Sequence, residues 1–378
     1  MRVGLIVNPI AGMGGRVALK GTDGVVEEAI KRGARPVAPE LVKLFLRELS
    51  TYPEARRIEF ITGPGPLGED ILREFNFPYD VIRHREIGYR LVDGIRIPDT
   101  TPEDTKELAR RMVGKVELLL FAGGDGTARD VVDAVDRKLP ILGIPTGVKM
   151  YSGVFATSPE DAAKLLVEFL RGRAGLEERE VRDIDEESYR HDEVRARTYE
   201  KAIVPVVETL VQGSKEGIPL DEEEELEAMT EAVAEEILEN DGIYFLGSGS
   251  TIKRIKDRLG IDGTLLGVDV VEVMDGKVRL LVKDATEKDL LRFADKDPKI
   301  VVTVIGGLNF LFGRGNQQFS AEVLRHIPKE NILVVATPSK IANGAIRVYT
   351  GDPEVDARLR GYLRVRVSPW RERVVRVL

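Results

Sequence analysis

Short apolar runs alternate with amphipathic segments along the first part of the chain. The apolar runs predict four strands, at residues 2–8, 57–62, 116–121 and 140–144. Helical spacing of apolar residues and helix-start signals predict four helices, at residues 39–50, 102–113, 127–137 and 159–171. The run 118–121 has no polar alternation, as expected of a strand that is covered on both faces. This order predicts an α/β domain with a parallel sheet and helices on both faces.

The pattern changes near Gly172, where charged segments predict strands at 177–189 and 193–204. Residues 221–239 contain ten acidic residues and an apolar stripe at helical spacing, which predicts a helix with one acidic face. Asp275-Gly276 predicts a hairpin between residues 265–274 and 278–283, and the tail 362–378 reads as two more strands. We therefore expect an α/β domain at 1–171, a β-rich domain at 172–378 whose tail can return to the first domain, and an active cleft between them.

The amino-acid composition excludes several classes of function for this protein. The chain has 378 residues, enough for two or three domains, and its net charge of -8 argues against a nucleic-acid binder. It has no cysteine, which excludes disulfides and thiolate chemistry, and only three histidines, so a metal site would use oxygen ligands suited to Mg²⁺ or Mn²⁺. No apolar stretch approaches the ~20 residues of a spanning helix, so we expect no membrane partner and a cytoplasmic protein. The 32% charged residues resemble thermophile composition.

A glycine-rich loop with one acid joins a predicted strand to a predicted helix. Gly123, Gly124 and Gly126 allow close approach of a ligand, and the amides up to Thr127 open the helix and favour phosphate. A tight turn explains the glycines but not Asp125. Its carboxylate suits a phosphate-bound cation or acceptance of a proton from an attacking hydroxyl, so Asp125 is the catalytic candidate.

Three further loops carry candidate binding residues. Asn8, Gly12, Gly14 and Gly15 follow the first strand, at the end where open α/β sheets bind ligands. In the second half, one loop offers hydroxyls to an anion and another offers a guanidinium for a phosphate and amides for a base or sugar. These two loops contribute Gly249, Ser250, Thr251, Arg314, Asn316 and Gln317. The alternative to ligand binding, for each of these loops, is an ordinary glycine-rich turn.

Three aspartates are candidate metal ligands besides Asp125. Strand geometry places Asp183 and Asp185 on one face, where a cation would relieve their repulsion, although a solvated face explains them equally well. Asp269 interrupts an apolar run, so it needs a metal, or backbone amides as partners. His84, flanked by charges, is expected at the surface, and Trp370 is expected to be a packing residue.

These motifs carry a family resemblance. Gly123–Thr127 together with Asn8-Pro9 resembles the superfamily of NAD kinases, diacylglycerol kinases and phosphofructokinases. Asp241-Gly242 and Gly249–Thr251 resemble NAD kinase elements, and Asp185-Glu186 lies where those enzymes carry an Asn-Glu pair. The fuller set is similar to the ATP-NAD/AcoX-kinase-like family, and it comprises Gly12–Gly15, Lys20–Asp23, Pro145–Lys149, Leu266–Asp269 and Gly313–Gln318.

The resemblance implies two domains, ATP as phosphoryl donor, a divalent cation (Mg²⁺ or Mn²⁺) and a homo-oligomer. It also implies that Asp125 activates a ribose hydroxyl and that Asp185, Glu186 and Lys149 contact the substrate. The leading hypothesis is a metal-dependent phosphotransferase acting on nucleotides, with NAD or a related hydroxyl acceptor as its small-molecule substrate. A metal-dependent phosphohydrolase or phosphodiesterase on the same scaffold, and a nucleotide-binding regulator without turnover, are the alternatives.

Overall fold

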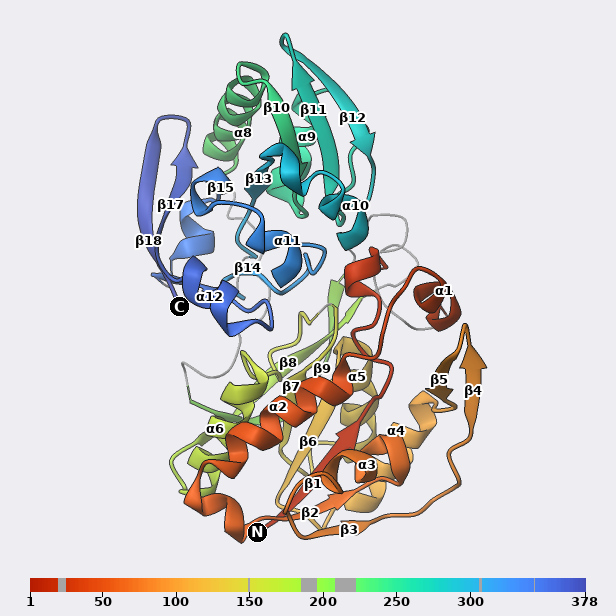
Figure 1. The fold of residues 1–378 in the computed structure, drawn as a ribbon. Coiled ribbons are helices and arrows are strands. Elements are labelled where there is room, and N and C mark those ends of the chain that lie inside the picture. The colour runs from red at the N-terminus through yellow and green to blue at the C-terminus, as the bar shows by residue number, and fades with distance from the viewer. Residues whose placement is uncertain (20–24, 149, 185–195, 208–221, 306–307, 343) are drawn as a thin grey trace. The chain divides into compact units, whose positions relative to one another are not determined.

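The computed structural model describes residues 1–19, 25–148, 150–184, 196–207, 222–305, 308–342 and 344–378 (Figure 1). The chain divides into two compact units, which are described separately below. The first comprises residues 1–14, 21–189 and 194–214, and the second comprises residues 15–20, 190–193 and 215–378. Within the described residues, no helix has both the length and the apolar composition needed to cross a membrane.

A five-stranded parallel sheet organises the first unit. Its strands, in the order β3-β2-β1-β6-β7, are β3 (Tyr79–Val81), β2 (Glu59–Thr62), β1 (Arg2–Val7), β6 (Leu118–Gly123) and β7 (Ile141–Pro145). All four pairings between neighbours are parallel. The predicted parallel sheet is therefore confirmed, and only the three-residue β3 was missed.

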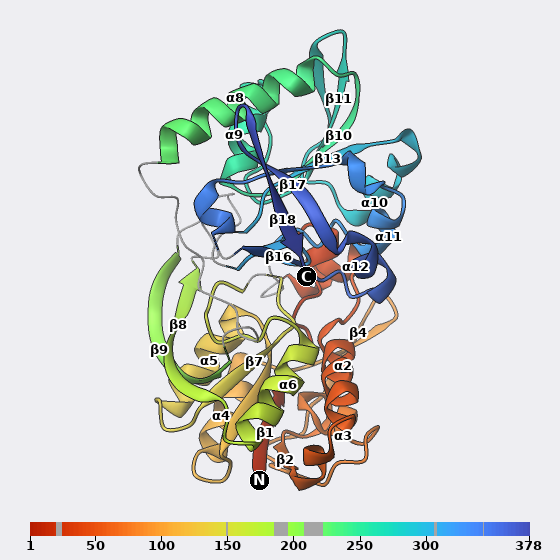
Figure 2. The same cartoon turned by 90° about the vertical axis from the view of Figure 1, so that its left-hand side faces the viewer.

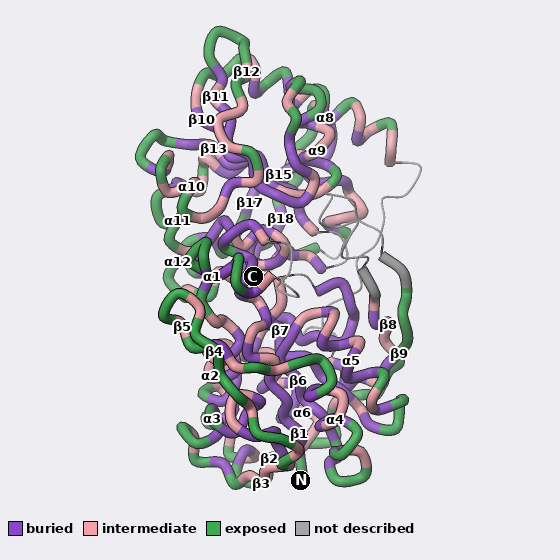
Figure 3. The backbone as a smooth tube through the Cα atoms, turned by 90° about the vertical axis from the view of Figure 1, so that its right-hand side faces the viewer, coloured by how far each residue is buried: buried purple, intermediate pink, exposed green. Residues whose placement is uncertain are grey.

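Helices cover both faces of this sheet. The main ones are α2 (Ala38–Ser50) and α6 (Pro159–Leu170), which pack together on one face, and α4 (Pro102–Met112) and α5 (Asp125–Val135), which pack together on the other (Figure 1). Short helices α1 (Val26–Lys31) and α3 (Glu69–Leu72) and a small hairpin of β4 (Tyr89–Val92) and β5 (Ile95–Pro98) complete the connections. This hairpin is mostly exposed, in contrast to the central strands (Figure 3).

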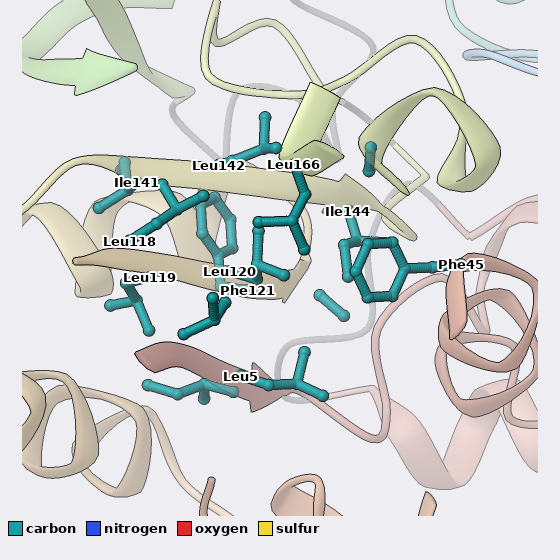
Figure 4. Packing of buried hydrophobic residues seen from close by; sticks show 14 of the residues in the cluster. Leu5, Phe45, Leu118, Leu119, Leu120, Phe121, Ile141, Leu142, Ile144 and Leu166 are labelled. Carbon is teal, nitrogen blue, oxygen red and sulfur yellow. The ribbon is translucent and has the colours of Figure 1, made fainter. Parts of the chain in front are cut away.

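The first hydrophobic core lies between the central strands and the helices. Every residue of β6 and β7 is buried, as the continuous apolar runs predicted. Phe45 and Leu166 bring apolar side chains from α2 and α6 toward these strands (Figure 4). Burial on both faces holds the strands rigidly, and loops at their ends start from fixed positions.

A long hairpin extends the first unit beyond the predicted boundary at residue 171. Its strands are β8 (Gly175–Ile184) and β9 (Ala196–Val206), which lie where the sequence predicted strands and which pair antiparallel. We assigned this segment to the second domain, but Val181, Ala202 and Val204 are buried in the first core. The backbone of Gly153 also donates to Glu180 (2.8 Å). Burial of these apolar side chains accounts for the hairpin's place in the first unit.

The second unit is built on a nine-stranded mixed sheet with the order β12-β11-β10-β13-β15-β17-β18-β16-β14. The strands are β10 (Gly242–Leu246), β11 (Asp269–Met274), β12 (Lys277–Val282), β13 (Lys299–Val302), β14 (Phe310–Phe312), β15 (Ile332–Val335), β16 (Ala345–Val348), β17 (Gly361–Ser368) and β18 (Arg371–Val377). The predicted hairpin β11–β12 is present, and the two strands predicted in the tail, β17 and β18, pair antiparallel. The β-rich character of the second half is confirmed, and β10, β13, β15 and β17 run parallel within it.

Two helices, α8 (Glu223–Leu238) and α9 (Ser250–Arg258), pack together against one face of this sheet. The apolar stripe of α8 is buried there, which confirms the predicted amphipathic helix. The shorter helices α10 (Glu287–Leu291), α11 (Ala321–Arg325) and α12 (Pro353–Leu359) accompany a second apolar cluster. The unit therefore has its own core, made of two clusters.

Two expectations about single residues were wrong. The His84 side chain is only 7% exposed, because its Nε2 lies 2.8 Å from a carboxylate oxygen of the buried Asp104. Trp370, expected to pack, is 94% exposed at the tip of the β17–β18 hairpin. In both cases neighbours in the sequence gave no information about the environment in the fold.

Candidate functional site

The two glycine-rich loops of the first unit lie at the carboxyl ends of adjacent strands. The chain builds β1, β2 and β3 in one direction across the sheet, then returns past β1 to add β6 and β7. The strand order therefore reverses between β1 and β6, and the loops that follow these two strands start at this point. Open α/β sheets bind ligands at such a reversal, where two loops diverge from neighbouring strand ends.

Side chains and backbone connect these loops directly. Asn8 Nδ2 donates to Thr127 Oγ1 (3.0 Å), which joins the loop after β1 to the first turn of α5. Gly12 has a φ of +80°, and an added Cβ would lie 2.1 Å from the carbonyl oxygen of Thr146, in the loop after β7. Only glycine permits this approach, so Gly12 has a structural role in joining the two loops, and its role in ligand binding stays a prediction.

The loop after β7 completes the arrangement. The backbone amides of Thr146 and Gly147 both donate to the Gly123 carbonyl (3.2 and 3.0 Å). Thr146 is 3% exposed, and its hydroxyl has no hydrogen-bond partner among the described residues. Three loops, after β1, β6 and β7, thus meet at one edge of the sheet, with α5 starting in their midst.

Asp125 is the first residue of α5, after the N-cap Gly124, and is 9% exposed. One carboxylate oxygen accepts the Tyr151 amide (2.7 Å), and the other accepts both the amide (3.0 Å) and the hydroxyl (2.6 Å) of Ser152. The Ser152 hydroxyl in turn accepts the amide of Arg182 (3.0 Å). These donors fix the carboxylate and compensate its charge at the helix N-terminus, which itself favours an anion.

The second unit presents the hydroxyl-bearing loop at the start of α9. Gly249 is the N-cap residue, and its amide donates to the Leu265 carbonyl (2.7 Å). Lys340, from the segment after β15, donates to Thr251 Oγ1 (2.7 Å) and Thr303 Oγ1 (3.3 Å). The loop therefore has an ammonium group beside it, in addition to the predicted amides and hydroxyls.

In the predicted loop that carries Arg314 and Asn316, both of these side chains are buried. Arg314 is 5% exposed, its guanidinium lies 4.8 Å from the Phe310 ring, and burial lowers the pKa of Arg314 to about 10. Asn316 accepts from the Gly313 amide (3.2 Å) and donates to the Leu311 carbonyl (2.8 Å), so both ends of its side chain shape its own loop. An added Cβ on Gly15 would lie 3.0 Å from that of Gln317, which places these two candidates side by side.

Asp269 is completely buried and paired with a buried lysine. Its Oδ2 lies 2.8 Å from Lys256 Nζ, and it also accepts the amides of Thr264 (2.7 Å) and Asp284 (2.9 Å). Lys256 donates further to the carbonyls of Thr264 (2.8 Å) and Gly267 (3.1 Å). The sequence allowed either a metal or backbone amides as partners of this carboxylate. In the structure its partners are two backbone amides and the ammonium group of Lys256.

The remaining candidates lie where the structure gives no side-chain description. Lys149, Asp185 and Glu186 lie outside the described residues, and only the backbone of Asp183 is described, within β8. In the parts of the chain that are described, no group of three or more His, Asp or Glu side chains is arranged to hold a metal. The metal assignments of Asp183 and Asp185, and the substrate assignments of Lys149, Asp185 and Glu186, remain predictions.

Sequence reasoning missed three residues that organise these loops. Ser152 and Lys340 come from the segments after β7 and β15, and the rule that strand ends meet could have identified both. Lys256 follows Ile252 by four residues and so lies on the apolar side of α9. A lysine on that face and an aspartate in an apolar strand are complementary signals that we did not connect.

Comparison with known proteins places the chain in a family. Residues 3–174 match the ATP-NAD kinase N-terminal domain, and residues 239–377 match the ATP-NAD kinase C-terminal domain. The first match ends close to the predicted boundary at residue 171, and the β8–β9 hairpin lies entirely between the two matches. A search of curated proteins finds no match.

Solved structures give only distant similarity. A putative diacylglycerol kinase from Bacillus anthracis str. Sterne is 16% identical, with a TM-score of 0.26, over 49% of this chain and 46% of that one. A conserved domain protein from Vibrio cholerae O1 biovar El Tor is 13% identical, with a TM-score of 0.25, over 99% of this chain and 90% of that one. The chain thus spans less than half of the Bacillus protein. Because the two domain matches together cover most of the sequence, in the expected order, the chain belongs to the ATP-NAD kinase family.

Proposed function

We propose that this protein is a kinase-like phosphotransferase that uses ATP to phosphorylate a hydroxyl group of NAD or of a related nucleotide. The observation that carries the proposal is the meeting of the glycine loops after β1 and β6, with Asp125 at the start of α5. Amides at a helix N-terminus favour phosphate, and an acid there serves the acceptor hydroxyl. The membership of the ATP-NAD kinase family supports the same class of reaction.

In the proposed reaction the acceptor hydroxyl oxygen forms a bond to the γ-phosphorus of ATP. The bond from that phosphorus to the bridging oxygen breaks, and ADP leaves. The hydroxyl proton passes to the carboxylate of Asp125, whose orientation Tyr151 and Ser152 hold. Backbone amides of Gly124–Thr127 compensate phosphate charge.

A divalent cation is expected to accompany ATP and to neutralise phosphate charge. The residues that the structure describes do not form a ready metal site. The oxygens of Asp125 accept backbone and hydroxyl donors, and Asp269 pairs with Lys256. We therefore assign the cation to the nucleotide.

Product analysis tests the proposal. The purified protein is incubated with ATP plus NAD and with ATP alone, in Mg²⁺ and in Mn²⁺, and the products are separated. ADP and phosphorylated dinucleotide in equal amounts, formed only with NAD present, are the expected result. Inorganic phosphate from ATP alone would instead indicate a phosphohydrolase. Nucleotide binding without any product would indicate a regulator.

A further inference from the structure

The β8–β9 hairpin contains a β-bulge. Val181 pairs with Glu200 and Arg182 pairs with Thr198, so Tyr199 is an extra residue on β9. Both strands of the hairpin pack against α5 (Figure 2). A bulge bends its strand and redirects backbone and side-chain groups, and bulges are frequent next to active sites. This bulge can therefore direct groups of the hairpin toward α5 and the residues around it.

On β8, a backbone amide at the bulge reaches the Ser152 hydroxyl. The Arg182 amide donates to Ser152 Oγ (3.0 Å), and Ser152 Oγ donates to a carboxylate oxygen of Asp125 (2.6 Å). An ionised carboxylate can only accept and an amide N–H can only donate, so the direction of both hydrogen bonds is fixed. Ser152 is completely buried, and hydrogen bonds in such a chain strengthen one another. The position of β8 therefore determines where the Ser152 hydroxyl points.

The turn at residues 151–153 also connects Asp125 to β8 through its backbone. The amides of Tyr151 and Ser152 donate to the two carboxylate oxygens of Asp125 (2.7 and 3.0 Å). The next amide, that of Gly153, donates to the Glu180 carbonyl of β8 (2.8 Å). A displacement of β8 would therefore move the donors that hold the Asp125 carboxylate.

On β9, the bulge residue contacts the second half of α5. The Tyr199 hydroxyl donates to Asp133 Oδ1 (2.7 Å), and the Arg129 guanidinium lies 6.0 Å from the Tyr199 ring. Lys106 of α4 lies 3.1 Å from the other carboxylate oxygen of Asp133. Asp133 lies about two helical turns after Asp125, which is roughly 12 Å along the axis. The hairpin is therefore connected to α5 near both ends of the helix.

We propose that the bulge of the β8–β9 hairpin positions the Asp125 carboxylate for catalysis, with Ser152 and Tyr199 as positioning residues. Both act through Asp125, and neither needs to touch the substrate. The inference rests on the proposed function, because it requires Asp125 to accept the proton of the acceptor hydroxyl. A displacement of about 1 Å can slow such a reaction about 100-fold. The hairpin lies between the two family matches, so membership of the family does not by itself assign this role.

Packing of the hairpin does not require these hydrogen bonds. Val181, Ala202 and Val204 are buried in the first core and already attach the hairpin to the first unit. A regular antiparallel ladder would serve that attachment equally well, since a bulge leaves one residue out of the ladder. The hydrogen-bonded chain leads from the bulge to the carboxylate that the proposed reaction uses. This placement favours a positioning role over a purely structural one.

Ser152→Ala removes the hydroxyl and keeps the backbone amide of residue 152. We expect kcat to fall about 10- to 100-fold and KM for ATP and for the acceptor to change less than about 2-fold, because the binding loops are untouched. The acid limb of the pH profile of kcat should move to higher pH by about one pH unit, because the lost donor no longer favours the ionised carboxylate. A variant with wild-type kcat and an unmoved pH profile would overturn the proposal.

Tyr199→Phe and Tyr52→Phe form a matched pair of variants. Each phenol hydroxyl donates to a carboxylate on a helix of the first unit. For Tyr199 this helix is α5, and for Tyr52 it is α2, where Glu48 accepts (2.9 Å). Both variants keep the ring, so both should fold, with similar small losses of stability in urea unfolding. Only Tyr199→Phe should lower kcat, by about 3- to 10-fold with KM unchanged. Equal kcat in the two variants would overturn the role of the bulge residue.

Amide hydrogen exchange, measured by mass spectrometry without nucleotide, tests the same connection independently of activity. The peptide that contains residues 151–153 should exchange about 10-fold faster in Tyr199→Phe than in the wild type or in Tyr52→Phe. Unchanged exchange would overturn the connection between the bulge and Asp125, even if kcat falls. A wild type that transfers no phosphoryl group but shows the expected exchange would refute only the proposed function. That result would still support the bulge as the element that holds Asp125.

Discussion

At the scale of single residues, Asp125 carries the most specific chemistry. Its carboxylate accepts three donors, so Asp125→Asn replaces an acceptor by an amide group that cannot accept from all of them. We expect kcat to fall roughly 10²- to 10⁴-fold if Asp125 is the general base. An unmatched donor should also lower the free energy of unfolding by about 1–3 kcal/mol. Steady-state kinetics and urea unfolding measure the two effects separately.

Asp130 provides a matched control on the same helix. It is 8% exposed, burial raises its pKa, and its carboxylate lies 3.3 Å from Lys106. Asp130→Asn should therefore leave kcat close to that of the wild type. If excess Mg²⁺ or Mn²⁺ restores part of the rate of Asp125→Asn, metal binding is the main role of Asp125. An Asp125→Asn enzyme with wild-type kcat would remove the main support for the phosphotransferase.

The buried pair of Lys256 and Asp269 allows a prediction about stability. Lys256→Met removes the ammonium and leaves a carboxylate that is completely buried, so the free energy of unfolding should fall by about 3–5 kcal/mol. Lys253→Met, one turn earlier on α9, removes a partly exposed ion pair with Asp257 and should cost about 1 kcal/mol or less. Urea unfolding measures both. Equal effects would mean that the buried pair contributes no more than a surface pair.

At the scale of elements, the start of α4 is the best defined. Thr101 and Asp104 form a capping box at the helix start that the sequence predicted. Burial opposes ionisation of Asp104, but hydrogen bonds from Arg85, His84 and the Thr101 amide outweigh it and hold the pKa of Asp104 well below its usual range. The ionised carboxylate therefore stabilises both the helix and the segment that carries His84.

This lowered pKa sets the direction of a pH dependence. The stabilisation is present above the unfolded-state pKa of about 3.9 and is lost as the pH falls toward the folded-state value. At pH 7, Asp104→Asn should reduce the free energy of unfolding by about 2–4 kcal/mol, and the difference from the wild type should shrink below about pH 4. Glu103→Gln, in the same turn but exposed, is the control. A difference that stays constant down to pH 2 would contradict the assignment.

At the scale of the whole molecule, two separate cores predict two unfolding transitions. Phe121 is fully buried in the core of the first unit, and Phe245 is fully buried in that of the second. Each change to alanine should cost about 3–5 kcal/mol, because a cavity is left in a packed interior. In calorimetry, Phe121→Ala should lower the temperature of one transition and Phe245→Ala that of the other. A single transition that both variants lower equally would show that the two units unfold together.

Much of the fold could be predicted because its signals are local. Continuous apolar runs predicted β1, β2, β6 and β7, and helix-start residues and periodicity predicted α2, α4 and α6 to within about two residues. The contact between the loops after β1 and β6 could also be predicted from the sequence, because the carboxyl ends of adjacent parallel strands lie at the same edge of a sheet. The strands β3, β14 and β16 were missed, because their three or four residues give little pattern of their own.

Local sequence pattern was therefore enough to predict the order of elements, the parallel sheet and the loops that carry the glycines and Asp125. The environment of each side chain became visible only in the folded chain, where Asp269 meets Lys256, His84 meets Asp104 and Trp370 meets solvent. The folded chain also shows that β8–β9 joins the first core. The physical reason is the range of the interactions involved. Backbone conformation and amphipathic pattern depend on residues a few positions apart, whereas burial and ion pairing depend on segments that meet only when the chain has folded.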